Sequence, residues 1–240
     1  MSILSTSERE RCARLSGIYS ARAVVARALV RSELAAALSM APSALEFVTG
    51  RHGKPEVFDP PQPIAFNLSH SGEWVVLAWQ AGSDAISLGV DVEQRMANRR
   101  DVMRLARRFF SLPEQLALEA LTGDARETLF YRLWTLKEAW VKAHGLALAP
   151  QLGKLAFSVN SGTLDVVNAT ALQTGRFFHG EAGVDGLVSL CALADDDRRI
   201  AVDARIGMPL GDWSPMSLGG WRDSMPGQES GLKNQTLKRK

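Results

Sequence analysis

The chain has 240 residues, of which 46% are hydrophobic and 22% charged, with a formal net charge of +2. This balance is typical of a soluble globular protein with one large domain or two small ones, and the charge is too small to indicate nucleic-acid binding. Two cysteines, Cys12 and Cys191, exclude a disulfide framework and a cysteine-rich zinc site. We find no signal-peptide pattern and no apolar run near the roughly 20 residues of a membrane span, so we expect a cytoplasmic protein with no membrane or nucleic-acid partner.

The hydrophobic pattern predicts helices followed by strands, twice over. Apolar residues at helical spacing predict a helix over residues 7–40. Strands are then expected at 45–49, 64–70, 74–79 and 88–94, with a Pro-rich loop at 60–63. Helices follow at about 99–109, after a capping box of Ser111 and Glu114, and at 125–144. Later strands are expected at 154–159, 163–168, 176–179 and 187–193, with 199–203 as a weaker candidate.

This order predicts an α+β fold of two similar lobes related by a pseudo-twofold axis. Each lobe would pack helices on a small, mainly antiparallel sheet, with a ligand cleft between the lobes. We place the N-terminal lobe at residues 1–86 and the C-terminal lobe, with the acidic site, at 87–208. The Gly/Pro-rich basic tail, 209–240, is expected to be disordered. Because one chain would build the whole cleft, we expect a monomer.

Carboxylates alternate with valines in the segment LGVDVEQ at 88–94. A strand there directs Asp91 and Glu93 to the same side. In the helix predicted for 125–144, an aromatic pair, a carboxylate and a lysine recur every four residues and form one stripe. Its members are Phe130, Trp134, Glu138 and Lys142. Two strand carboxylates and a helix carboxylate beside a lysine suit Mg²⁺ that holds a phosphate ester.

Two further segments carry groups suited to phosphate. The turn around Gly53 allows close backbone approach, and Lys54 offers a point charge. Ser69 and His70 lie at a strand end, where both side chains could donate to phosphate oxygens. In isolation, an ordinary surface turn and a histidine bonded to a carbonyl are the more common explanations of these segments. Arginines crowd residues 9–31 and 99–108, where they could meet phosphates or an acidic protein partner, or line a solvated helix face.

The series GKP, FNLSHS, GVDVE, FFSxxE and FxxLWTLKEAWVKxxG resembles the large-type 4′-phosphopantetheinyl transferases of the surfactin-synthetase-activating class, over residues 5–193. Such enzymes transfer 4′-phosphopantetheine from coenzyme A to a serine of an apo acyl or peptidyl carrier protein. They release adenosine 3′,5′-bisphosphate and use Mg²⁺. Their fold is two similar α+β lobes with coenzyme A in the cleft.

The resemblance implies a role for each matching residue. Asp91, Glu93 and Glu138 would bind Mg²⁺, and Glu138 would also be the general base toward the carrier serine, directly or through water. Lys142 and His70 would contact the pyrophosphate. The residues expected to bind the nucleotide end of coenzyme A, including its 3′-phosphate, are Arg11, Arg51, Gly53, Lys54, Asn67 and Ser69. Trp134 would pack beneath the acidic site.

Two alternatives come from other functional classes. A non-catalytic family member could bind coenzyme A or a carrier protein without turnover, but such a chain would be expected to lose an acidic residue or Lys142. A Mg²⁺-dependent nucleotide hydrolase on another fold is disfavoured because the sequence has no P-loop and no paired histidines. The sequence leaves open which carrier protein is modified.

Overall fold

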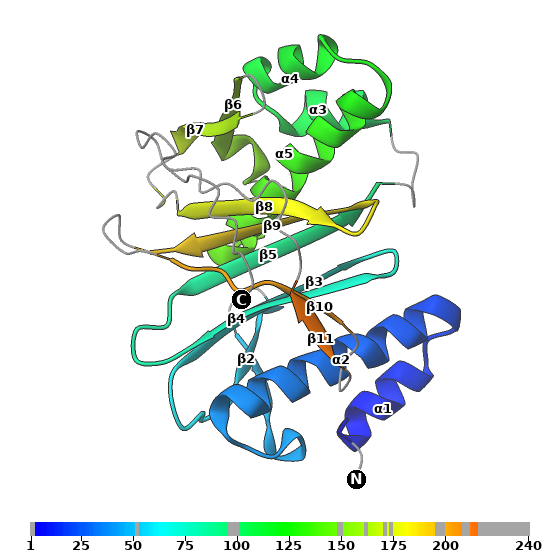
Figure 1. Cartoon of the computed structure of the whole chain (residues 1–240), viewed down its shortest axis with the longest axis vertical. Coiled ribbons are helices and arrows are strands. Elements are labelled where there is room, and N and C mark those ends of the chain that lie inside the picture. The colour runs from blue at the N-terminus through cyan, green and yellow to red at the C-terminus, as the bar shows by residue number, and fades with distance from the viewer. Residues whose placement is uncertain are drawn as a thin grey trace, which may run out of the picture.

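The computed structural model of the chain combines helices with small antiparallel sheets, as expected for an α+β protein (Figure 1). The residues that it describes are 3–50, 53–95, 101–147, 151–160, 163–169, 172, 175–194, 200–207 and 212–215. Within them, no helix is both long and apolar enough to cross a bilayer.

Two helices replace the single helix predicted for residues 7–40. α1 (Thr6–Ala13) begins at a capping box of Ser5 and Glu8, and α2 (Gly17–Leu38) begins at Gly17. Gly17 has a φ of 55°, a left-handed conformation that a right-handed helix cannot continue through. The chain therefore turns before α2, and α1 packs against α2.

A buried ion pair joins these two helices. Arg31 on α2 donates from Nε to Glu8 Oε2 over 2.7 Å, and its Nη1 donates to the carbonyls of Pro42 and Leu45 over 2.6 and 3.0 Å. Both side chains are largely shielded from water. The guanidinium thus fastens α1, α2 and the segment after α2 to one another.

Short strands complete the N-terminal half. β3 and β4 form an antiparallel hairpin whose register runs from Ile64–Ala81 to Ser71–Trp74. α2 lies along this hairpin (Figure 1). The elements are η1 (Pro42–Ala44), β1 (Phe47–Thr49), β2 (Pro55–Val57), β3 (Ile64–Ser71) and β4 (Trp74–Ala81).

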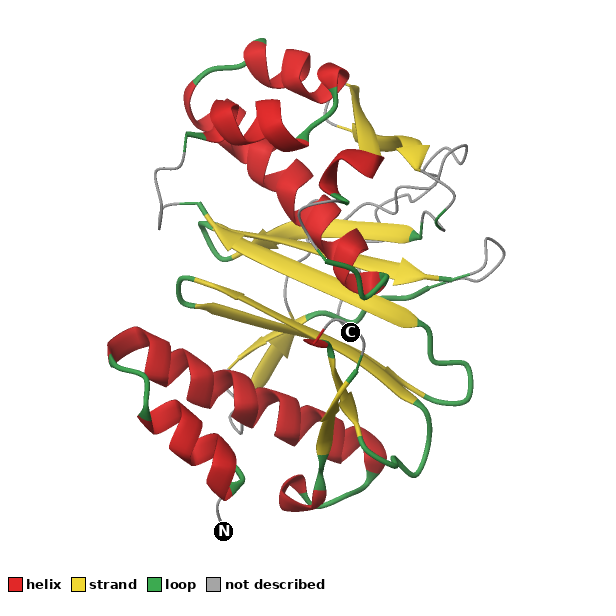
Figure 2. Cartoon of the chain, turned by 180° about the vertical axis from the view of Figure 1, so that it is seen from behind, coloured by secondary structure: helices red, strands yellow, loops and turns green. Residues whose placement is uncertain are grey.

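The C-terminal half packs three helices on strands. β5, β9 and β8 form an antiparallel sheet in that order, and α5 crosses it (Figure 2). The elements are β5 (Ser87–Gln94), α3 (Val102–Phe109), α4 (Leu112–Glu119), α5 (Gly123–Ala143), η3 (Leu152–Lys154), β6 (Leu155–Asn160), β7 (Thr163–Ala169), β8 (Arg176–Ala182) and β9 (Gly186–Leu193).

A buried lysine orients α5 within this half. Lys137 is fully buried and lies 3.1 Å from Glu114 on α4, which is also fully buried. Its ammonium donates to the carbonyls of Leu152, over 3.0 Å, and Leu155. The neighbouring residue on α5, Glu138, is thereby held toward the sheet.

After β9 the chain returns to the N-terminal half. Ile200 and Val202 pack on an apolar cluster to which β4, β5 and β9 contribute, although residues 200–203 form no strand. β10 (Arg205–Gly207) then pairs antiparallel with β11 (Trp213–Pro215). Residues 213–215 are therefore a strand within the segment that we expected to be disordered. The rest of that segment after residue 215 lies outside the described residues.

Candidate active site

Gly89 sets the distance between β5 and α5, the two elements that carry the acidic residues. A Cβ atom on Gly89 would lie 2.0 Å from the carbonyl oxygen of Ala139 and 2.3 Å from the amide nitrogen of Ala143. These are backbone atoms of a helix and cannot move aside separately, so only glycine permits this contact. The close approach brings the acidic part of α5 onto Asp91.

The side chains of β3 connect the two halves of the chain along β5. Three alternate residues at the end of β3, namely Asn67, Ser69 and Ser71, bond to β5, and we call them the β3 polar row. Their side-chain oxygens accept from the backbone amides of Val90 (2.8 Å), Val92 (3.4 Å) and Gln94 (3.2 Å), in that order. The order shows that β3 and β5 run parallel.

The two serines of the polar row also bind the strand carboxylates. Ser69 Oγ donates to Asp91 Oδ1 over 2.8 Å, and Ser71 Oγ donates to Glu93 Oε2 over 2.7 Å. Hydroxyls of the N-terminal half therefore orient both carboxylates of β5.

Lys142 and Glu138 on α5 meet Asp91. The Lys142 ammonium lies 2.5 Å from Asp91 Oδ1 and 3.7 Å from Glu138 Oε2, and donates to Ser69 Oγ over 3.1 Å. Burial, followed by the charge of Asp91, raises the pKa of Glu138 to about 8. Burial also raises the pKa of Asp91, which Lys142 and Ser69 partly offset. The ammonium of Lys142 thus lies close to both Asp91 and Glu138, whose carboxyl groups repel each other.

This group has the donor chemistry of a divalent cation site. Asp91 Oδ2 is buried and has no hydrogen-bond partner in the described part of the chain. Glu93 adds a third carboxylate, whose charge raises the pKa of both Asp91 and Glu138. Hard oxygen donors with an excess of negative charge fit Mg²⁺. As the side chains stand, however, no three His, Cys, Asp or Glu residues among those described already have metal-site spacing.

Positive charge surrounds His70 at the end of β3. Burial, then the charge of Arg22, lowers the pKa of His70, and Lys142 and Arg27 add to this effect. Arg22 is held in place because its Nη1 donates to the carbonyl of Gly72 over 3.0 Å. The imidazole is therefore neutral at neutral pH, among cations that would attract an anion. We call Arg22, Arg27, His70 and Lys142 the anion group.

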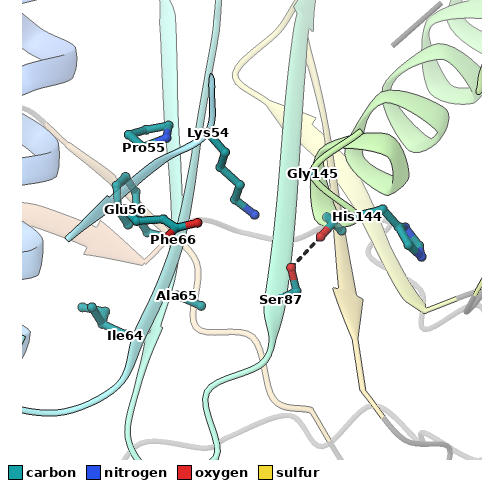
Figure 3. A pocket seen from close by; sticks show the side chains of 10 residues that line it. Lys54, Pro55, Glu56, Ile64, Ala65, Phe66, Ser87, His144 and Gly145 are labelled. Carbon is teal, nitrogen blue, oxygen red and sulfur yellow. Dashed lines mark hydrogen bonds between the residues drawn. The ribbon is translucent and has the colours of Figure 1, made fainter. Parts of the chain in front are cut away.

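Two cavities lie between the halves of the chain. One of about 280 Å³ extends between β2, β3 and β5 and the end of α5 (Figure 3). The other, of about 180 Å³, is lined by Gly53, Asn67 and Lys142, among others. Lys54 lines both, and its ammonium donates to the carbonyls of Leu88 (2.9 Å) and Lys142 (3.4 Å). Lys54 therefore links the start of β2 to β5 and α5. We did not predict these two hydrogen bonds from the sequence.

Models of known protein families match most of this chain. A family model described as the 4′-phosphopantetheinyl transferase superfamily matches residues 87–201, and one described as 4′-phosphopantetheinyl transferase, N-terminal, matches residues 1–82. The chain is 35% identical over 160 residues to the 4′-phosphopantetheinyl transferase Sfp of Bacillus subtilis, covering 66% of this chain and 67% of that protein. The chain belongs to the 4′-phosphopantetheinyl transferase superfamily.

Two further proteins show partial similarity. The 4′-phosphopantetheinyl transferase AcpT of Escherichia coli is 40% identical over 100 residues, which are 42% of this chain and 49% of that protein. A crystal structure of a holo-(acyl-carrier-protein) synthase from Bacillus anthracis, in complex with CoA, shares 13% identity and a TM-score of 0.38. That match covers 45% of this chain and 95% of the other.

The sequence also predicted Arg11, Arg51 and Gly53 for this transferase's site, and Trp134 for the packing beneath it. Arg11 is exposed on α1, and Gly53, with a φ of 84°, lines the smaller cavity. Arg51 lies outside the described residues. Trp134 is 7% exposed and stacks on Phe130 with ring centroids 5.7 Å apart, so it packs in the core as expected. The roles of these residues in binding stay predictions.

Sequence reasoning overlooked Ser71 and did not assign Arg22 and Arg27 to the site. Ser71 continues the alternation of Asn67 and Ser69 along one strand, so the period of two could have identified it. The two arginines belong to a cluster that a solvated helix face explains equally well. Only the packing of α2 beside the β3–β4 turn distinguishes them from their neighbours.

Proposed function

We propose that this transferase moves 4′-phosphopantetheine from coenzyme A to a serine of an apo acyl or peptidyl carrier protein, releasing adenosine 3′,5′-bisphosphate. The observation that carries the proposal is the meeting of Asp91 on β5 with Glu138 and Lys142 on α5, beside the cations around His70. This arrangement joins a site for a divalent cation to a site for phosphate. Family membership supports the same reaction.

Mg²⁺ would be held by Asp91, Glu93 and Glu138. Asp91 Oδ2, which has no hydrogen-bond partner among the described residues, and the mutual repulsion of the carboxylates support this assignment. When bound, the ion supplies positive charge that neutralises the phosphates of the substrate. The ammonium of Lys142, which now neutralises Asp91, would then be available to those phosphates.

Glu138 is the proposed general base. A serine hydroxyl is a weak nucleophile and needs a base within hydrogen-bond reach, directly or through one water. The carboxylate of Glu138 lies beside Lys142 and carries oxygen atoms that can accept the serine proton.

The anion group would bind the phosphates of coenzyme A. Lys142 and His70 are assigned to the pyrophosphate, and Arg22 and Arg27 lie close enough to His70 to contribute charge. Phosphoryl transfer needs charge neutralisation and positioning more than covalent help from the protein, and this group can supply both. Arg11 remains the proposed contact to the 3′-phosphate.

The two cavities and their lining residues are the proposed place for the nucleotide end. Gly53, Lys54 and Asn67 line the smaller one, and Ser69 lies beside it in the β3 polar row. We further propose that the two halves are lobes related by pseudo-twofold symmetry, that coenzyme A lies in the cleft between them, and that the protein is a cytoplasmic monomer.

The test is direct. The protein is incubated with coenzyme A, Mg²⁺ and a panel of apo carrier proteins, and each carrier is weighed by intact mass spectrometry. We expect one carrier to gain one phosphopantetheine group, and omission of Mg²⁺ to prevent the gain. Binding of coenzyme A without any mass gain across the panel would instead favour the non-catalytic alternative.

A further inference from the structure

Asp185, in the turn between β8 and β9, joins the two halves of the chain at the end of β5. Trp74 Nε1 donates to its Oδ1 over 3.1 Å, and Gln94 Nε2 donates to its Oδ2 over 2.5 Å. Trp74 begins β4 and Gln94 ends β5, so one carboxylate bridges elements of both halves. We call Trp74, Gln94 and Asp185 the clasp.

Glycines allow the parts of the clasp to lie close together. A Cβ on Gly72 would lie 1.5 Å from Gln94 Oε1, and one on Gly183 would lie 2.8 Å from the ring of Trp74. The same Gln94 oxygen accepts from the amide of Glu73 over 3.1 Å. Gln94 therefore holds the β3–β4 turn with one side-chain atom and Asp185 with the other.

The turn that carries Asp185 is itself anchored. The amide of Arg95 donates to the Asp185 carbonyl over 3.0 Å. The Arg95 guanidinium donates to the carbonyl of Val184 and to Thr128 Oγ1 on α5, each over 2.9 Å. The β8–β9 turn, which carries Asp185, is therefore fixed to β5 and α5. For this reason, the hydrogen bonds of Asp185 hold the β3–β4 turn in place.

The β3–β4 turn also positions two of the four residues of the anion group. Arg22 donates to the carbonyl of Gly72, and His70 lies two residues before that glycine. Lys142, by contrast, is bound to Asp91 in the middle of β5. A shift of the turn relative to β5 would therefore move Arg22 and His70 away from Lys142.

We propose that Asp185 is a positioning residue for phosphate binding, because it holds the β3–β4 turn against the end of β5 and so fixes Arg22 and His70 beside Lys142. This inference rests on the proposed function, in which Arg22, His70 and Lys142 bind the phosphates of coenzyme A. Asp185 acts through Gln94 and Trp74 and is not a catalytic residue.

The test compares Asp185→Ala with the wild-type protein. The KM for coenzyme A should rise about three- to tenfold, the size expected for losing one or two hydrogen bonds, while kcat and the KM for the carrier protein stay within about twofold. The Kd of adenosine 3′,5′-bisphosphate, measured by calorimetry, should rise by the same factor. Asp185→Asn keeps one acceptor oxygen and should give an intermediate value.

Asp203→Ala is the matched control. Asp203 is an exposed aspartate that also accepts two hydrogen bonds, both from Arg205, over 2.6 and 3.1 Å. Its loss should leave the KM for coenzyme A and the Kd of the bisphosphate unchanged. An equal rise in both aspartate variants would contradict the proposal.

Further outcomes would overturn the inference. These are an unchanged KM and Kd in folded Asp185→Ala, or a fall in kcat alone, which would indicate general support of the fold. If Asp185→Ala does not fold, Trp74→Phe removes one donor but keeps a ring over Gly183, and it must raise the Kd. If the wild-type protein binds adenosine 3′,5′-bisphosphate but transfers nothing, only the proposed function is contradicted. The role of the clasp is still tested, because the Kd of the bisphosphate can be compared between the wild-type protein and the Asp185 variants.

Discussion

Ser69 Oγ lies 2.8 Å from Asp91 Oδ1 and 3.1 Å from Lys142 Nζ, so one hydroxyl of the N-terminal half contacts both members of the central ion pair. It accepts from the ammonium and donates to the carboxylate. The pair itself belongs to the C-terminal half. The orientation of the acidic group is therefore shared by both halves of the chain, although its charges come from one.

Loss of a carboxylate should abolish transfer. We expect Asp91→Ala and Glu138→Ala each to lower the transfer rate about 100-fold or more while leaving the protein folded, because a charge-stabilising group is removed. Mass spectrometry of the carrier measures transfer, and Mn²⁺ titration followed by electron paramagnetic resonance measures metal binding. Glu119→Gln, an exposed glutamate on α4, is the control. A near wild-type rate in either alanine variant would refute the assignment of the metal ligands.

Removal of Lys142 should separate phosphate binding from metal binding. We expect Lys142→Ala to lower turnover by about two to three orders of magnitude, because its charge no longer offsets the phosphates. Lys142→Arg should recover little, since the planar guanidinium does not fit a point contact between two carboxylates. Lys154→Ala, at an exposed lysine in η3, should have no effect. Unchanged kinetics in Lys142→Ala would remove it from the site.

The strand–helix contact at Gly89 predicts a loss of stability. Gly89→Ala places a methyl group 2.0 Å from a helix carbonyl, so β5 and α5 must separate, and we expect a loss of about 1–3 kcal/mol or more. Denaturant unfolding measures this change. At Gly153, the nearest atom would lie 4.0 Å from an added Cβ, so Gly153→Ala should be nearly neutral. Equal stability of the two variants would contradict the proposed close packing.

The ion pair between Glu8 and Arg31 predicts a pH dependence of stability. Burial alone would raise the pKa of Glu8, but hydrogen bonds from Arg31 and Ser5 outweigh it and hold the pKa below the ordinary value of 4.5. A lowered carboxyl pKa adds stability that is complete above pH 4.5 and is lost as the pH falls through the folded-state value.

We therefore expect Glu8→Gln to lower the free energy of unfolding by about 2 kcal/mol at pH 7. The difference from wild type should shrink below pH 4.5, and unfolding curves recorded from pH 3 to 7 measure it. A difference that stays constant with pH would show that the carboxylate charge is not involved.

The basic end of α3 is a candidate contact for an acidic carrier protein. Arg104, Arg107 and Arg108 are exposed there, and Leu112 and Leu116 are exposed on the neighbouring α4. Arg107→Glu should raise the KM for the carrier several-fold at low salt and less at high salt, because exposed charges are screened. The KM for coenzyme A should not change. Arg205→Glu, an exposed arginine on β10, is the control, and an equal effect there would argue against a specific contact.

Local sequence patterns determined which side of a strand or helix several site residues occupy. The alternation in GVDVE predicted that Asp91 and Glu93 share one side of a strand, and the spacing of Glu138 and Lys142 predicted one helix face. Both follow from the fixed periods of strands and helices, which depend on neighbouring residues alone. The series of motifs also identified the family, which the comparisons confirmed.

Only the tertiary structure decided how these segments meet. The sequence could not show that the Lys54 ammonium donates to the carbonyl of Leu88, that Ser71 binds Glu93, or that Asp185 joins Trp74 to Gln94. Each contact links residues 22 or more positions apart, including 111 between Trp74 and Asp185, so no local period encodes it. Such contacts depend on which faces pack together, and that depends on the whole core at once.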